Sequence, residues 1–178
     1  MAREAVIVGV ADIPLKNGVS AVPMSPLQMQ ARAAKDALAE ARLSLKDVDG
    51  LLTAGMWGIG GAGQLAAVTL SEYLGIIPRF ADSPNLGGCA FEASVGHAQM
   101  AIERGDCEVA LITYGSTQKS DRSRNLGGRP PSLTMQYEAP FGLPTPIGGY
   151  ALAAMRHMHE FGTTSEQLAE IAVATRKW

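Results

Sequence analysis

Cys89 is the residue whose type and setting best suit nucleophilic chemistry. It follows Gly87 and Gly88 and directly precedes a segment of small and apolar residues that is predicted to be a helix. The free N–H groups and positive potential of a helix N-terminus favour a thiolate and can stabilise a developing oxyanion. The glycines would let a substrate approach the backbone closely. The alternative interpretation is a small cysteine that packs in the core like alanine.

A second candidate site is the glycine-rich turn Gly58–Gly63, which matches the dinucleotide-binding pattern G-x-G-x-x-G. It lies between a predicted strand and a predicted helix, and Asp82 follows about twenty residues later, as the pattern requires. That pattern normally follows the first strand of its domain, whereas the first apolar run here leads into Asp12–Pro14. A nicotinamide-binding protein is therefore the rival interpretation of this turn.

A cluster of basic residues follows in a segment where Asp121 is the opposing charge. The cluster consists of Lys119, Arg122, Arg124 and Arg129. Such cations could hold phosphate groups, or they could form a solvated basic loop.

The remaining cysteine and the histidines suggest no metal site. Cys107 lacks a helix terminus or flanking bases, so a structural role is expected. His97 lies two turns inside a predicted helix, where we expect it to face a packed layer. His157 and His159 stand two residues apart and therefore do not share a helix face.

The composition predicts one globular protein with a substantial core. The 178 residues are 47% hydrophobic and 18% charged, and the net charge of −2 argues against a dedicated nucleic-acid-binding protein. Two cysteines without metal-ligand spacing fit a reduced, cytoplasmic setting. The uncharged stretch Leu51–Ser71 is about as long as a membrane span, but its glycines favour a strand, a turn and a helix, so no span is expected.

Strands and helices are predicted to alternate along the first two thirds of the chain. Ser25-Pro26-Leu27-Gln28 is a capping box that begins a helix, and Gly75 and Gly105 are typical helix ends. The order β-α-β-α-β-α-β predicts right-handed crossovers and a largely parallel sheet. The predicted strands are 5–10, 51–54, 79–82 and 109–113, and the predicted helices between them are 25–41, 64–74 and 90–104.

The last of these helices, residues 90–104, has small or apolar groups on most of its faces, which predicts a helix buried between two layers. The pattern changes after Gly115, where residues 116–149 are rich in proline and glycine. Two further helices are predicted, one at 150–161 and one that begins at the capping box Thr164–Gln167. We find no C-terminal stop signal and therefore expect a fragment of a larger enzyme.

Together these pieces resemble the N-terminal half of the thiolase superfamily. The most similar branch is the lipid-transfer, sterol-carrier-protein-type thiolases of bacteria. The segment Arg156–Ile171 of this chain closely resembles the helix pair in the loop domain of that branch. The resemblance covers nearly the whole chain. The segments that carry it are, in order, Val6–Gly9, Asp49–Leu51, Glu72–Gly75, Asn85–Ala90 and Gly105–Leu111.

This resemblance implies a layered αβαβα fold of class α/β. Residues 1–115 would form its N-terminal βαβαβαβ half, and residues 116–178 would form part of a helical loop domain. It also implies an acyltransferase of lipid metabolism that cleaves or forms 3-ketoacyl-CoA through an acyl-enzyme on Cys89. Acyl-CoA would be the substrate, no cofactor would be tightly bound, and the protein would be a cytoplasmic homodimer. Further expected substrate contacts are Gly87, Gly88, Arg122 and Arg124.

Three departures from the family keep other functions open. Counting back from Gly105 by the usual family interval ends at Gly88 rather than Cys89. Some members of this branch lack the cysteine and are acyl-CoA aldolases that work with a small OB-fold (DUF35-like) partner. The family's catalytic histidine lies in a C-terminal half that has no counterpart here. A retro-aldolase and a non-catalytic thiolase-like subunit are therefore the alternatives to the acyltransferase.

Overall fold

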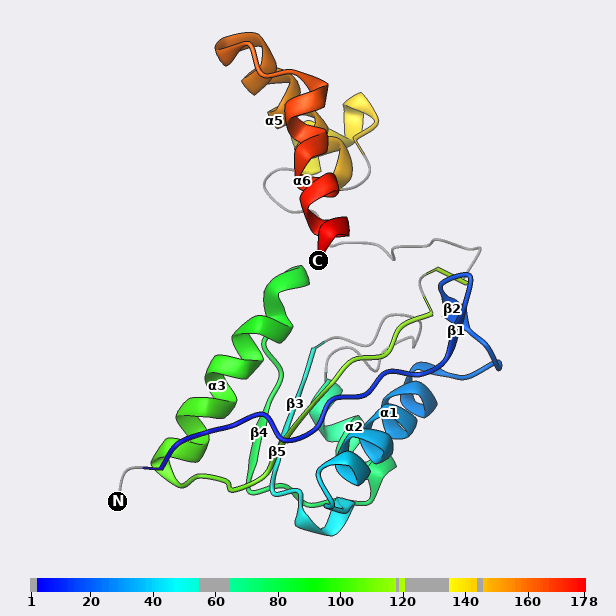
Figure 1. Cartoon of the computed structure of the whole chain (residues 1–178), viewed down its shortest axis with the longest axis vertical. Helices are drawn as coiled ribbons and strands as arrows, with labels where there is room; N and C mark the ends of the chain where they lie inside the picture. The colour runs from blue at the N-terminus through cyan, green and yellow to red at the C-terminus, as the bar shows by residue number, and fades with distance from the viewer. Residues whose placement is uncertain (1–2, 55–64, 118, 121–134, 144–145) are drawn as a thin grey trace. The chain divides into compact units, whose positions relative to one another are not determined.

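A computed structural model describes residues 3–54, 65–117, 119–120, 135–143 and 146–178 (Figure 1). The chain divides into two compact units, Met1–Arg124 and Asn125–Trp178. The predicted boundary after Gly115 stays a prediction. Within the described residues, no helix combines the length and apolar character that crossing a membrane requires.

The first unit is built on a parallel sheet. Its strand order is β4 (Phe80–Asp82), β3 (Gly50–Thr53) and β5 (Ala110–Thr113), and β3 pairs in parallel with both neighbours. The expected α/β class and parallel sheet are thereby confirmed. A small antiparallel hairpin of β1 (Leu15–Lys16) and β2 (Val19–Ser20) precedes α1 (Pro26–Glu40). The elements in chain order are β1 (Leu15–Lys16), β2 (Val19–Ser20), α1 (Pro26–Glu40), the 3-10 turn η1 (Leu45–Asp47), β3 (Gly50–Thr53), α2 (Ala66–Leu74), β4 (Phe80–Asp82), the 3-10 turn η3 (Gly87–Cys89), α3 (Ala90–Arg104) and β5 (Ala110–Thr113).

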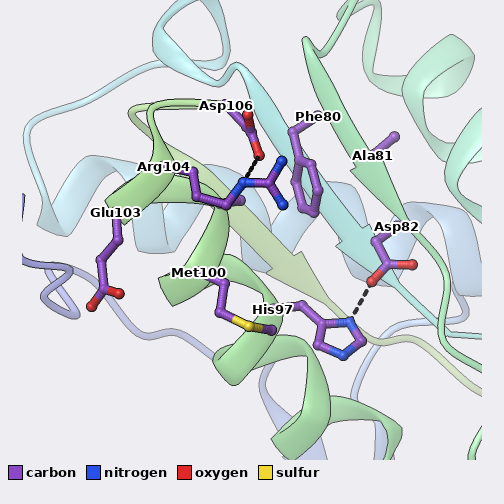
Figure 2. Close-up of a pocket in the computed structure, with 9 residues that line it drawn as sticks. Phe80, Ala81, Asp82, His97, Met100, Glu103, Arg104 and Asp106 are labelled. Carbon is purple, nitrogen blue, oxygen red and sulfur yellow. Dashed lines mark hydrogen bonds and ion pairs between the residues drawn. The ribbon is translucent and has the colours of Figure 1, made fainter.

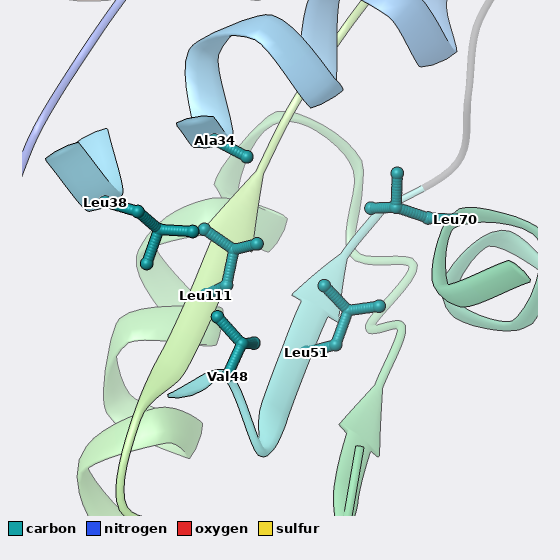
Figure 3. Close-up of a cluster of buried hydrophobic side chains, with 6 residues drawn as sticks. All are labelled: Ala34, Leu38, Val48, Leu51, Leu70 and Leu111. Carbon is teal, nitrogen blue, oxygen red and sulfur yellow. The ribbon is translucent and has the colours of Figure 1, made fainter. Parts of the chain in front are cut away.

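Helices cover both faces of this sheet. α1 and α2 pack on one face and α3 on the other (Figure 1). Side chains alternate between the two faces of a strand, so Leu51 and Leu111 point toward α1 and α2. The hydrophobic cluster on that side is shown in Figure 3 and consists of Ala34, Leu38, Val48, Leu51, Leu70 and Leu111.

Local signals explain where the helices begin and end. The Ser25 hydroxyl accepts the Gln28 N–H, and the Gln28 side chain accepts the Ser25 N–H, which completes the predicted capping box. α3 begins at Ala90 and ends at Arg104, as predicted, because Gly105 adopts the left-handed conformation with φ +83°. α2 ends in the same way before Gly75.

The predicted strand at Ala5–Val10 is wrong. The segment pairs with no described strand, and its four valine and isoleucine side chains are 58–76% exposed. α1 holds it instead: the Val10 N–H donates to Glu40 Oε2 at 2.7 Å, and a Cβ on Gly9 would lie 2.2 Å from the Ala37 carbonyl oxygen. An apolar, β-branched run favours a strand only where a neighbouring strand is there to pair with it.

The environment of α3 also differs from the prediction. Its buried residues, Ala90, Ser94, Ala98 and Ala101, form one stripe toward the sheet. Val95 and Met100 on other sides are 46% and 54% exposed. Small residues allow close packing on any face, but in the described residues only one face of α3 is covered.

The second unit is helical. It contains α4 (Met135–Glu138), the 3-10 turn η4 (Ala139–Phe141), α5 (Pro146–Phe161) and α6 (Ser165–Lys177). The predicted capping box is present, since the Thr164 hydroxyl accepts the Gln167 N–H and the Gln167 side chain accepts the Thr164 N–H. All residues of α6 are exposed.

The buried core predicts a strong contrast between two leucines. Leu51 is fully buried in β3, whereas Leu15 in β1 is 54% exposed. We expect Leu51→Ala to lower the free energy of unfolding by about 2–5 kcal/mol, because it leaves a cavity. Leu15→Ala should change it by about 0.5 kcal/mol or less. Urea unfolding followed by circular dichroism measures both, and equal losses would contradict this core.

Candidate functional site

Cys89 stands at the N-cap of α3 and is exposed. Its thiol donates to the Leu86 carbonyl oxygen, with the sulfur 3.2 Å away. Gly87 in the preceding turn has φ +74°, a conformation that favours glycine, and the space beside Gly87 and Gly88 is open. The interpretation of Cys89 as a small core residue is therefore wrong, and the turn is accessible to a ligand.

Apolar side chains lie near this turn. Tyr114 follows β5, and its ring meets Phe91, in the first turn of α3, edge to face at 4.8 Å. Tyr114 and Leu86 are 48% and 58% exposed. The carboxyl end of a parallel strand thus lies beside a helix N-terminus, which is where α/β proteins commonly bind ligands. This site can hold an anionic oxygen at the N–H groups and an apolar group beside it.

Cys107 has the structural role that was expected. It is fully buried, and a Cβ on Gly50 would lie 2.8 Å from its sulfur. Burial raises the pKa of the Cys107 thiol, and the nearby carboxylates of Asp49 and Asp106 raise it further. Its thiolate, the reactive form, is therefore disfavoured.

A cavity of about 450 Å³ lies beside β4 and α3 (Figure 2). His97 Nδ1 lies 2.5 Å from Asp82 Oδ2 at its wall, and the His97 side chain is 39% exposed. We expected His97 to face a packed layer, and it instead forms a carboxylate-oriented imidazole at a cavity. Sequence reasoning missed this pair because an acid at a strand end and a histidine in the next helix form no recognisable pattern.

Several predicted site residues cannot be placed. Arg122, Arg124 and the turn Gly58–Gly63 lie outside the described residues. Lys119 lines a cavity of about 260 Å³ between the β1–β2 hairpin and α1, together with Ser20.

Within the described part of the chain, no group of three or more histidine, cysteine, aspartate or glutamate residues could hold a metal ion.

Two curated proteins are similar in sequence. The chain is 34% identical over 161 residues to a steroid side-chain-cleaving aldolase of Thermomonospora curvata. It is 33% identical over 162 residues to a 17-hydroxy-3-oxo-4-pregnene-20-carboxyl-CoA lyase of Mycobacterium tuberculosis. Each match covers 86% of this chain and 40% of the relative, so the chain spans less than half of their length. No protein-family profile matches the chain.

Solved structures define the fold. The Ltp2-ChsH2(DUF35) aldolase matches with a TM-score of 0.74 and 29% identity, over 98% of this chain and 43% of that one. An acetyl-CoA acetyltransferase from Syntrophomonas wolfei matches with a TM-score of 0.64 and 17% identity, over 99% of this chain and 46% of that one. The fold is thiolase-like. The predicted fold class is confirmed, apart from its first strand.

The acyltransferase prediction is wrong. Both curated relatives of this thiolase-like chain are named as an aldolase or a lyase, and neither as a transferase. The prediction rested on Cys89 at the start of α3. That feature does not decide between the two activities, because one fold can carry different chemistries at the same place.

The two cysteines should differ in reactivity. We expect iodoacetamide at neutral pH to modify Cys89 roughly tenfold or more faster than Cys107, because Cys107 is buried with a raised pKa. Peptide mass spectrometry after timed quenching measures both rates. Comparable rates in the folded protein would contradict the geometry of this site.

Proposed function

We propose that this chain is part of a lyase that cleaves the side chain of a steroid acyl-CoA by a retro-aldol reaction. The observation that carries the proposal is the 34% identity to a steroid side-chain-cleaving aldolase over 161 residues. The name of the second relative supplies the substrate chemistry: a hydroxyl on C17, next to C20, which bears the thioester carbonyl. We place the chain in the aldolase-type branch of the thiolase-like proteins.

The reaction needs no covalent intermediate. A base removes the proton of the C17 hydroxyl, the C17–C20 bond breaks, and a ketone forms at C17. The electron pair of the broken bond becomes an enolate of the thioester, with negative charge on the thioester oxygen. Protonation at C20 then gives a shortened acyl-CoA. Stabilising that oxygen is the main electrostatic task of the site.

In this proposal the turn before α3 performs that task. The backbone N–H groups of Gly87, Gly88 and Cys89 lie at the positive end of a 15-residue helix, where a negative oxygen is favoured. The Cys89 thiol is a bystander, held by the Leu86 carbonyl oxygen. Tyr114 and Leu86 would contact the apolar substrate. We leave the base that removes the hydroxyl proton unassigned.

The proposal extends to the rest of the assembly. Arg122 and Arg124 would contact the phosphates of coenzyme A, and no tightly bound cofactor takes part, since the retro-aldol step requires none. A small OB-fold (DUF35-like) protein would be the partner, as the name of the Ltp2-ChsH2(DUF35) aldolase suggests. We further propose a homodimer that acts in the cytoplasm on acyl-CoA.

The decisive experiment combines product analysis with Cys89→Ala. We expect the protein, with its partner, to convert a 17-hydroxy-pregnene-20-carboxyl-CoA into a 17-ketosteroid and a shortened acyl-CoA, resolved by liquid chromatography and mass spectrometry. Cys89→Ala should keep turnover within about threefold, because the thiol forms no bond to the substrate. Absence of the 17-ketosteroid would refute the lyase proposal, and an acyl adduct on Cys89 or loss of turnover in this variant would refute the bystander role of the thiol.

A second variant tests the turn itself. Gly87→Ala places a side chain at φ +74°, so the N–H groups should shift and kcat should fall roughly tenfold or more. Gly96→Ala is the matched control, because Gly96 lies inside α3 with open space and no positive φ. Steady-state kinetics of both variants decide the matter. Equal kcat values for the two variants would show that the turn takes no part in the mechanism.

A further inference from the structure

Gln30 lies far from the turn before α3 in sequence but is tied to the same end of the sheet. It is a residue of α1 and is fully buried. Its side-chain oxygen accepts the Thr113 hydroxyl at 2.8 Å and lies 3.2 Å from the Thr53 hydroxyl, whose shorter hydrogen bond goes to the Thr113 carbonyl oxygen at 2.9 Å. Thr53 ends β3 and Thr113 ends β5, so one carboxamide joins the carboxyl ends of two parallel strands to α1.

The backbone beyond β5 is pressed against the same helix. A Cβ on Gly115 would lie 2.4 Å from the Pro26 carbonyl oxygen and 2.9 Å from Gln30 Cγ. The backbone that follows β5 therefore cannot move toward α1. Tyr114 lies on that path, between the residue bound to Gln30 and the glycine pressed against it.

Tyr114 carries this constraint to the candidate site. Its ring packs edge to face on Phe91, two residues after Cys89 at the start of α3. A continuous series of contacts therefore runs from Gln30 through Thr113 and Tyr114 to the turn that presents the N–H groups.

The hydrogen bonding of Gln30 is incomplete in a way that an apolar residue would avoid. Its Nε2 is buried and has no hydrogen-bond partner among the residues that the structure describes. A buried donor without a hydrogen bond destabilises a fold. A leucine at this position has no donor and would avoid that loss of stability. Stability alone therefore does not explain a glutamine at this position. The hydrogen bonds of its side-chain oxygen are the better reason for its presence.

We infer that Gln30 is a positioning residue that sets the geometry of the α3 N-terminal turn through the Gln30–Thr113 hydrogen bond and the Tyr114–Phe91 contact. The inference rests on the proposed function only where turnover is the readout. The geometry itself can be tested on the chain as it is, because Cys89 reports on the turn and the buried Cys107 reports on global opening.

The test measures alkylation of both cysteines by iodoacetamide in Gln30→Leu, Thr113→Val and the double variant. We expect each single variant to change the Cys89 rate about threefold or more while Cys107 stays slow to react, because the hydrogen bond of the Cys89 thiol and its place at the helix N-terminus shift while the core stays closed. The double variant should show no further change, since both substitutions remove the same hydrogen bond. Gln99→Leu, which alters an exposed glutamine bonded to Glu103, is the matched control.

Two results would overturn the inference. In the first, Cys89 reacts at the unsubstituted rate in both single variants. In the second, Cys107 becomes reactive together with Cys89, because Gln30 would then merely hold the fold. If Gln30→Leu does not fold, Thr113→Val alone decides, by the same two criteria.

Turnover adds a separate measurement in the assembled protein with the 17-hydroxy-pregnene-20-carboxyl-CoA substrate. Gln30→Leu should lower kcat roughly tenfold and leave KM within about threefold, since positioning affects the reacting oxygen more than ground-state binding. An unchanged kcat would count against the inference. No turnover in the unsubstituted protein would instead refute the proposed lyase activity, and the alkylation rates would still decide the role of Gln30.

Discussion

Asp49 holds together the amino ends of the three parallel strands through its carboxylate and its backbone oxygen. Its Oδ1 accepts the N–H groups of Glu108 and Val109, both at 2.8 Å, just before β5. The Asp49 backbone oxygen accepts the N–H groups of Arg79 and Phe80 at the start of β4, and Asp49 itself directly precedes β3. Charge-assisted hydrogen bonds are among the strong ones, so this one residue sets the register on which the sheet depends.

The sheet is fixed at both ends, and the two ends serve different purposes. At the amino ends, the partly exposed carboxylate of Asp49 carries a charge, and its second oxygen lies 3.6 Å from Arg79. Gln30 uses neutral hydrogen bonds in a dry interior at the carboxyl ends. A buried charge there would be costly, whereas an amide can bind two hydroxyls without one. The candidate site lies at the second end, so its geometry depends on the neutral network.

Local chemistry made part of this structure predictable. The capping box at Ser25 and the glycine after Arg104 act within a few residues, so both could be recognised in the sequence. The segment Ala5–Val10 could not be judged this way, because pairing depends on residues far along the chain. The same holds for the contacts of Gln30, whose partner Thr113 is 83 residues away. Function was the hardest to predict, because the exposed turn that carries Cys89 suits two chemistries on one fold.

The central position of β3 has a consequence for the order in which the molecule can form. β5 is the last strand of the sheet in sequence, yet it pairs directly with β3, and α1 bonds to its end. During synthesis, α1 and β3 emerge long before the strand that completes their hydrogen bonds. The hydrogen bonds that β5 then makes join Val109 to Asp49 across 60 residues and Thr113 to Gln30 across 83 residues. Contacts of such separation form slowly because a long loop must close first, so the sheet can be completed only after Thr113 has left the ribosome.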